Sequence, residues 1–183
     1  MSLEATIRIG DRILCDDGGT SAVIRAILID PVAGIFDRVV IEPAHRVAIG
    51  QFATADKISV SDGTLTFDGY LAFFDMSTRA EIPEWSNPQS RNVGTVKGSV
   101  IPVEGLMTLE GTTPVLDQHG QEVGNLVGVT VRAGTAIDSF VIRVPGRLRH
   151  KDVRVARDHE VVELEGAMRL NVAGDELRRR PGV

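Results

Sequence analysis

One pattern of residues occurs twice in the chain: two apolar residues, Asp, two further residues, Gly and then a long apolar run. The first copy is LCDDGGTSAVIRAILID at residues 14–30, and the second is VLDQHGQEVGNLVGVTV at residues 115–131. An internal repeat constrains the fold more than any local feature, because each copy has to form the same supersecondary unit. We therefore expect two similar units that arose by duplication of one.

The segments that follow each copy also correspond. IDPVAGIFDRVVIEP (29–43) matches VTVRAGTAIDSFVIRVP (129–145), since each contains a strand-like run, a turn with Gly, an Asp, a second run and a Pro. ADKISVSDGTLTF (55–67) matches HKDVRVARDHEVVEL (150–164). In the latter pair apolar and β-branched residues alternate with polar ones around a polar turn, which indicates half-buried strands joined by a tight turn.

These patterns predict a mostly β protein made of two tandem small β-barrels, each closed by a short helix. The helices are expected at residues 70–76 and 173–180, where each copy ends in an amphipathic segment. The first barrel domain is expected to span residues 1–82 and the second residues 99–183. Residues 83–98 are rich in Pro, Ser, Asn and Gly, which indicates a linker between the two domains.

Two features near the linker fall outside the repeated pattern. Trp85 is the only tryptophan, and we expect it to plug the end of the first barrel. The apolar segment SVIPVEGLMTL, residues 99–109, precedes the second copy. Because small barrels leave strand edges that must be covered, we expect this segment to be ordered against a barrel, either its own or a neighbour's.

The composition is that of a soluble globular protein: the chain has 183 residues, of which 43% are hydrophobic and 25% charged. No apolar run reaches the ~18–20 residues that a membrane-spanning helix needs, and the N-terminus lacks the features of a signal peptide. The single cysteine, Cys15, excludes an internal disulfide and a multi-thiolate metal site. We therefore expect a cytoplasmic protein without membrane insertion.

Each repeat resembles the PRC-barrel family, the small β-barrel of the photosynthetic reaction centre H subunit and of the C-terminal part of the ribosome maturation factor RimM. The resemblance lies in CDDGGTSAVIRAILIDPVAGIFDRVVIEPAHR and in LDQHGQEVGNLVGVTVRAGTAIDSFVIRVPGRLRHKDVRV, and it covers nearly the whole chain outside the linker. It implies an interaction domain without a catalytic motif. The second copy carries Arg147 and Arg149 where many tandem relatives have the His and Trp of a Gly-His-Leu-Trp-Gly motif.

The sequence contains no recognisable catalytic or metal-binding constellation. Its four histidines stand in expected turns or loops, without metal-ligand spacing to one another or to Cys: His45, His119, His150 and His159. Asp16, Asp17 and Asp117 are better explained as turn residues than as acid–base groups or calcium ligands. Gly124 and Gly128 lack the following helix that a phosphate-binding loop requires. We therefore expect no enzyme activity, no cofactor and no metal ion.

The segment RVPGRLRHKDVRVAR, residues 143–157, is the one cluster of charge with a functional interpretation. Its basic residues are Arg143, Arg147, Arg149, His150, Lys151, Arg154 and Arg157. On alternating strands some of them share a face, which predicts a docking surface for an acidic protein or for a phosphate backbone. The alternative is a solvated strand edge whose charge is balanced by neighbouring acidic residues.

The leading functional hypothesis is a non-catalytic adaptor or assembly subunit that docks on a protein partner in a larger complex. The alternative is an RNA- or ribosome-associated maturation factor that uses the basic residues of the second barrel. The net charge of −5 and the 4% aromatic content weigh against RNA. A third hypothesis is an enzyme or small-ligand binder with a site between the barrels, and self-association of the chain is also left open.

Overall fold

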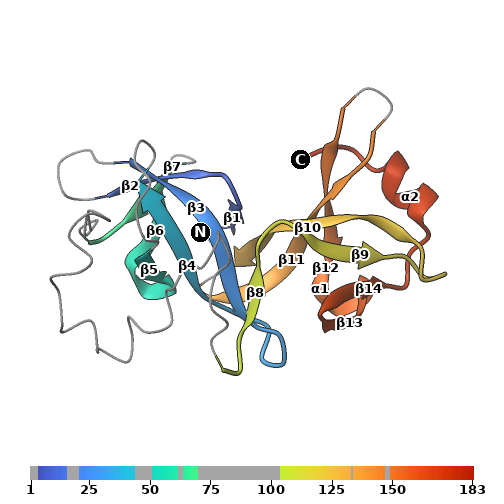
Figure 1. Ribbon diagram of the computed structural model, residues 1–183, viewed down its shortest axis with the longest axis horizontal. Helices are drawn as coiled ribbons and strands as arrows, with labels where there is room; N and C mark the ends of the chain where they lie inside the picture. The colour runs from blue at the N-terminus through green and yellow to red at the C-terminus, as the bar shows by residue number, and fades with distance from the viewer. Residues whose placement is uncertain are drawn as a thin grey trace, which may run out of the picture.

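The computed structural model describes the residues in the ranges 4–15, 21–43, 51–61, 64–69, 104–132, 134–146 and 149–183. Within these ranges the protein is mostly β, as the sequence predicts (Figure 1). The expected first helix at residues 70–76, the linker at 83–98 and Trp85 lie outside the described residues, and so do Asp16 and Asp17.

The strands of the described ranges fall into two sets of seven in chain order. The first set consists of β1 (Glu4–Arg8), β2 (Arg12–Cys15), β3 (Ser21–Asp30), β4 (Ile35–Pro43), β5 (Gln51–Thr54), β6 (Ile58–Ser61) and β7 (Thr64–Phe67), with a short 3₁₀ turn, η1 (Ala55–Lys57), before β6. The second set consists of β8 (Met107–Leu109), β9 (Thr113–Leu116), β10 (Glu122–Arg132), β11 (Ala136–Val144), β12 (Lys151–Ala156), β13 (Val161–Glu165) and β14 (Ala167–Leu170). The α-helices among the described residues are α1 (Arg157–Glu160) and α2 (Gly174–Arg179), and α2 confirms the helix expected at residues 173–180.

The two sets repeat one pattern of strand pairing. In the first set β3 pairs antiparallel with β2 and β4, β4 with β5, and β6 with β7, while β2 and β7 run parallel. The second set has the same pairs among β9 to β14, including the parallel pair of β9 and β14. The repeated sequence pattern therefore reflects a repeated structure.

The irregularities of the long strands are repeated as well. The pairing of β3 with β4 shifts register between Ile24 and Ala26, and the pairing of β10 with β11 shifts between Leu126 and Gly128. A β-bulge bends a strand and increases its twist, and its position is part of the fold rather than a defect. Bulges at matching places therefore give the two long strands the same curvature.

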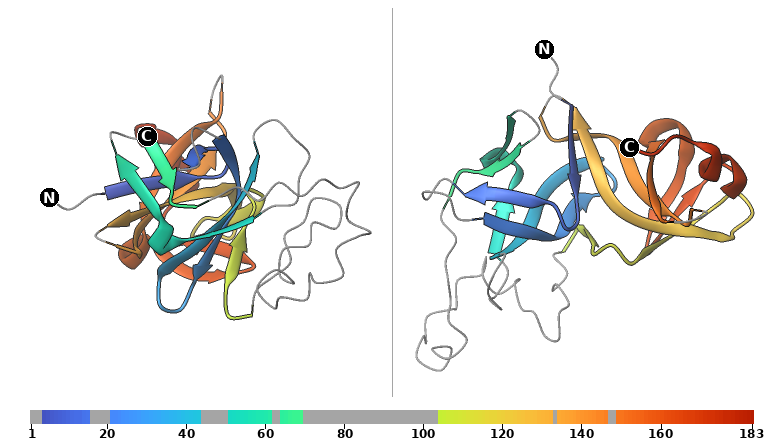
Figure 2. Two further views of the ribbon diagram at one scale, coloured as in Figure 1. Left: turned by 90° about the vertical axis from the view of Figure 1, so that its left-hand side faces the viewer. Right: turned by 90° about the horizontal axis from the view of Figure 1, so that it is seen from above.

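The first strand of each set lies in the sheet of the other set. β1 pairs antiparallel with β10, and β8 pairs antiparallel with β3 (Figures 1 and 2). The register is equivalent, because Ile7 lies opposite Val129 and Leu109 lies opposite Ile27. This reciprocal exchange places β1 and β8 at the seam between the two sets.

The exchange joins all fourteen strands into one mixed sheet. β4 and β11 also meet directly, through the pair Ile35 and Ala136. One continuous hydrophobic core contains buried residues of both sets, among them Ile7 of β1 and Leu109 of β8. The boundaries at 1–82, 83–98 and 99–183 stay a prediction, and this one sheet is not shown closed into the two separate barrels that the sequence predicts.

Two glycines of β10 allow strands to approach its backbone closely. A Cβ atom on Gly128 would lie 2.5 Å from the carbonyl oxygen of Ile7, and one on Gly124 would lie 2.2 Å from that of Arg143. Neither neighbour is the flexible end of a side chain, so any larger residue would displace backbone. Gly124 and Gly128, which no helix follows as one would in a phosphate-binding loop, thus have a packing role.

The apolar segment at residues 99–109 is ordered in its described part. Met107–Leu109 forms β8 against β3, and the side chain of Leu109 is fully buried. The prediction that this segment is ordered is confirmed for these residues, which pair with a strand of the set that precedes the segment in the chain. Residues 99–103 lie outside the described residues.

Asp117 connects the turn before β10 to the start of α2. Its carboxylate accepts hydrogen bonds from the backbone N–H groups of His119 (2.9 Å), Gln121 (3.0 Å) and Gly174 (3.2 Å). The structure thereby confirms that Asp117 is a turn residue. Burial raises the pKa of this carboxyl, but the three N–H donors outweigh burial and hold its pKa below the usual value.

The depressed pKa predicts a pH-dependent contribution of Asp117 to stability. A carboxyl whose pKa is lower in the folded state stabilises the protein above its unfolded pKa, and the contribution is lost as the pH falls through the folded value. Asp117→Asn should therefore lower the melting temperature at pH 7, and this deficit should be smaller at pH 3, which lies below the ordinary Asp pKa of about 3.9. Thermal unfolding at both pH values checks this.

The control for this experiment is Asp175→Asn, which alters an exposed carboxylate paired with Arg178 at the surface of α2. Its melting temperature should stay close to that of the wild type at both pH values, because exposed ion pairs contribute little to stability. An Asp117→Asn deficit of equal size at pH 7 and pH 3 would contradict the proposed role of the carboxylate.

Candidate functional site

The β11–β12 hairpin carries most of the predicted basic cluster. Arg143 lies on β11, Lys151 and Arg154 on β12, and Arg157 at the start of α1. Arg149 and His150 immediately precede β12 and are exposed, whereas Arg147 lies outside the described residues. The described members of the predicted cluster therefore lie on this hairpin or directly beside it.

The arginines of this cluster are largely neutralised within the chain. Arg143 forms a two-point contact with Asp152, Nε to Oδ1 at 2.9 Å and Nη2 to Oδ2 at 3.1 Å. This hydrogen bonding raises the pKa of Arg143 above its usual value. Arg157 pairs with Asp158. The guanidinium groups thus contact carboxylates that would compete with any phosphate ligand.

Arg154 and Lys151 have structural partners in distant parts of the chain. Arg154 pairs with the carboxylate of Glu4 and donates a hydrogen bond to the hydroxyl oxygen of Thr6 at 3.0 Å, so it fastens β12 to β1. Lys151 donates from Nζ to the carbonyl oxygens of Arg178 and Arg180 at the end of α2. Cations at a helix C-terminus are favourable there.

The pair of Arg154 and Glu4 replaces an apolar cluster of the first set. By strand register, Arg154 corresponds to Phe52 and Glu4 to Leu106. Phe52 and Leu106 pack on a small cluster of buried Ala26, Leu28 and Val40. The two repeats have therefore diverged on this face, which is apolar in the first set and ionic in the second.

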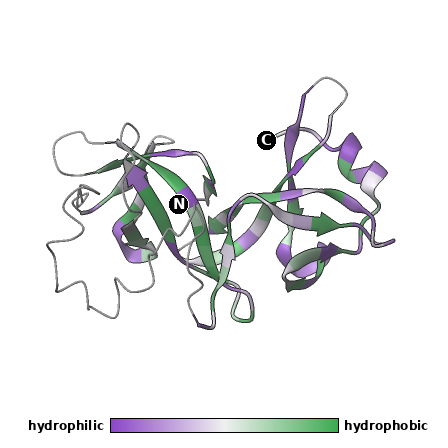
Figure 3. Ribbon diagram, viewed as in Figure 1, coloured by the Kyte–Doolittle hydropathy of each residue, from purple (hydrophilic) through white to green (hydrophobic). Residues whose placement is uncertain are grey.

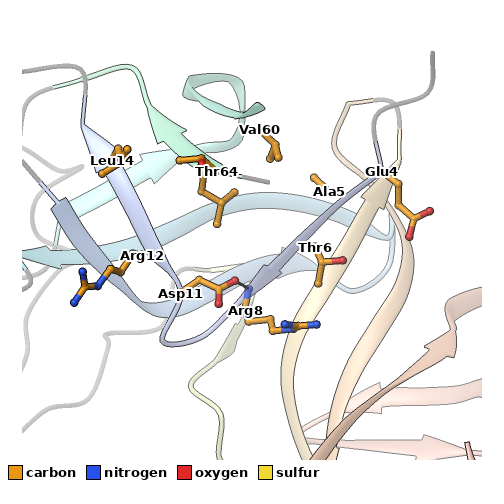
Figure 4. A pocket seen from close by; sticks show the side chains of 10 residues that line it. Glu4, Ala5, Thr6, Arg8, Asp11, Arg12, Leu14, Val60 and Thr64 are labelled. Carbon is orange, nitrogen blue, oxygen red and sulfur yellow. Dashed lines mark hydrogen bonds between the residues drawn. The ribbon is translucent and has the colours of Figure 1, made fainter. Parts of the chain in front are cut away.

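A groove lies at the seam between the two sets, along β1 (Figure 4). We call it the β1 groove; it encloses about 580 Å³. Its lining residues come from β1, from the turn and strand that follow it, and from the β6–β7 hairpin: Glu4, Ala5, Thr6, Arg8, Asp11, Arg12, Leu14, Val60, Thr64 and Leu65. The groove therefore combines charged and apolar side chains from the first two strands of the first set, β1 and β2, and from its last two strands, β6 and β7.

Asp11 organises one end of the β1 groove. Its Oδ2 atom accepts a hydrogen bond from the backbone N–H of Arg8 at 3.0 Å, and its own N–H donates to the carbonyl oxygen of Arg8 at 3.1 Å. Burial raises the pKa of Asp11, an effect that the hydrogen bond and charge of Arg8 partly offset. The Nε atom of Arg8 is buried without a hydrogen bond, 4.0 Å from Asp152.

The sequence did not identify the β1 groove as a site. Residues 4–8 alternate polar and apolar side chains, with Ala5 and Ile7 buried, so their period of two is a signal for a strand. The groove also requires the β6–β7 hairpin to lie near β1, and no local pattern encodes that neighbourhood. The sequence therefore predicts a docking surface for an acidic protein or a phosphate backbone on the basic segment of the second set and not on β1.

Within the described residues, no three His, Cys, Asp or Glu side chains are grouped to hold a metal ion. His119 contacts Gln118, while His159 lies in α1 and not in the loop that the sequence predicts. None of the helices in the described part of the chain is long and apolar enough to cross a membrane.

The chain matches no protein-family model and no curated protein. The resemblance to the PRC-barrel family therefore stays a prediction from the sequence. The functional interpretation rests on the geometry of the β1 groove and of the basic hairpin.

Proposed function

We propose that this protein is a non-catalytic interaction subunit, an adaptor that docks on a protein partner in a larger assembly. We also propose that each set of seven strands is a PRC-barrel-like unit, completed by the first strand of the other set. The repeated strand pairing supports this, because the bent long strands and the parallel pair occur in both sets. The fused pair of units would act as one rigid platform.

The observation that carries the proposal is the β1 groove, in which apolar and charged side chains surround a strand that pairs on one side. Leu14 is 41% exposed there, although it is a large hydrophobic residue. Specific interfaces have an apolar centre and a polar rim, and the groove has both kinds of side chain within a small area. A protein surface or segment fits this chemistry.

The basic hairpin favours a protein partner over RNA. Arg143, Arg154 and Arg157 already contact carboxylates of the same chain, so each would have to exchange an internal ion pair for a phosphate. RNA affinity depends on basic groups that release counterions when they meet phosphates. Among the described members of the cluster, Arg149, His150 and Lys151 have no ion pair to a described side chain, and Lys151 is bound to two carbonyl oxygens, which leaves a small basis for nucleic-acid binding.

Site-specific photo-crosslinking in cells tests the proposed function. A photoreactive amino acid at position 60 places the probe in the β1 groove, and one at position 162 replaces a valine that is 68% exposed on β13. We expect a discrete protein adduct from position 60 and none from position 162. Adducts to RNA, or the same background at both positions, would contradict an interaction through the groove.

A further inference from the structure

The orientation of the backbone groups of β1 follows from the hydrogen bond that Ile9 makes just beyond the strand. The N–H of Ile9 donates to the carbonyl oxygen of Val127 at 2.9 Å, so odd-numbered residues of this strand direct their main-chain groups toward β10. Thr6 and Thr130 then form a pair without backbone hydrogen bonds, in which side chains lie closest. Their hydroxyl oxygens are indeed 3.3 Å apart.

The opposite edge of β1 therefore presents the N–H and C=O groups of Thr6. Those of Arg8 point to the same side but are both bonded to Asp11. In the described part of the chain, β1 pairs with β10 and with no other strand. An unpaired strand edge is a template for another extended chain, and here it lies along the β1 groove (Figure 4).

The charges of the groove leave a positive side. Glu4 pairs with Arg154, and Asp11 is bonded to the backbone of Arg8. Arg12 lines the groove without an ion pair to any described residue, whereas Arg8 is paired with Asp152, Nε to Oδ2 at 4.0 Å. A carboxylate brought into the groove would meet the guanidinium group of Arg12.

We propose that the β1 groove binds an extended segment of a partner protein as an added antiparallel strand. Main-chain hydrogen bonds form at Thr6, apolar side chains of the segment contact Leu14 and Val60, and an acidic side chain pairs with Arg12. Strand addition takes its affinity from the main chain and its specificity from alternate side chains. This inference rests on the proposed function and names the partner's chemistry: an extended apolar segment with a carboxylate.

Selection of peptides on the full-length protein tests the inference. A phage-displayed library of random decapeptides is panned on the wild type, and synthetic copies of the selected peptides are titrated by calorimetry. We expect alternating apolar residues and an acidic residue in the selected sequences. Thr6→Pro removes the N–H that faces the groove and should weaken binding roughly tenfold or more, the equivalent of one or two hydrogen bonds.

Thr6→Val is the matched control, since it removes the same hydroxyl but keeps the N–H, and it should bind like the wild type. Arg12→Ala should weaken acidic peptides and reduce the salt dependence of their association. If Thr6→Pro fails to fold, hydrogen exchange of the Thr6 amide in the wild type replaces it, and the selected peptide should protect that amide.

Failure to select alternating sequences, or equal binding to Thr6→Pro and the wild type, would overturn strand addition. Protein adducts at position 60 would still support an adaptor, so the two proposals can fail separately. Sedimentation velocity of the wild type identifies the remaining occupant. A reversible dimer that Thr6→Pro dissolves would show that a second copy of the chain fills the groove, which would overturn the assignment to a partner protein.

Discussion

Residues 99–183 produced alone will lack a cooperative thermal transition, and a synthetic peptide of residues 1–11 will restore it. The fragment retains β8 to β14 but lacks β1, which covers β10 and buries Ala5 and Ile7. Losing one buried Ile side chain costs about 2–5 kcal/mol, and a whole domain is stable by only about 5–15 kcal/mol. Circular dichroism during heating, with and without the peptide, measures the effect.

The control peptide carries Ile7→Asp and should not restore the transition, because it would bury a carboxylate against Val129. A fragment that melts cooperatively at the temperature of the full chain, without added peptide, would show that the exchanged strand is dispensable. The second unit would then be self-contained.

Leu109→Ala should destabilise the protein by about 2–5 kcal/mol, the usual range for a fully buried leucine. Leu109 follows the linker in sequence but lies opposite Ile27 of β3, so the cavity would open in the core of the first set. Urea unfolding checks this through a lower midpoint with an unchanged slope.

Val32→Ala is the control for this substitution, because Val32 is 91% exposed in the turn between β3 and β4. Surface substitutions of this kind change the free energy of unfolding by less than about 0.5 kcal/mol. A comparably small effect of Leu109→Ala would mean that β8 contributes little to the first set.

Much of the fold could be predicted because it is encoded locally. The duplicated pattern, the alternating strands and the helix α2 each depend on residues close in sequence, and the structure contains all three. Asp117 was also interpretable, since an Asp that bonds N–H groups two and four residues later is a local turn feature.

The exchange of β1 and β8 could not be predicted. The alternation of Ala5 and Ile7 with polar residues is the same whichever sheet the strand joins, so the pattern indicates a strand but not its partner. The register of β1 on β10, and that of β8 on β3, depends on the two folded long strands and on their bulges. Sequence reasoning therefore placed β1 in the first unit and left open whether residues 99–109 pack against their own unit or a neighbour's.

The candidate site shows the same division between local and distant information. The run of basic residues at 143–157 is visible in the sequence, but the partners of Arg154 and Lys151 are Glu4 and the end of α2. These contacts turn much of a predicted docking surface into an internal network. The β1 groove shows the reverse. Its residues form no recognisable motif in the sequence, and they are brought together only by the exchanged strand.

Native-state hydrogen exchange on the wild type and Leu109→Ala tests most directly whether strand exchange couples the two sets into one cooperative unit. Core amides exchange through opening reactions whose free energies can be measured residue by residue. If the sets are coupled, the substitution lowers the opening free energies in β11 and β12 by the same amount as in β3 and β4. Lowered values in β3 and β4 with unchanged values in β11 and β12 would contradict this account and indicate two independent domains.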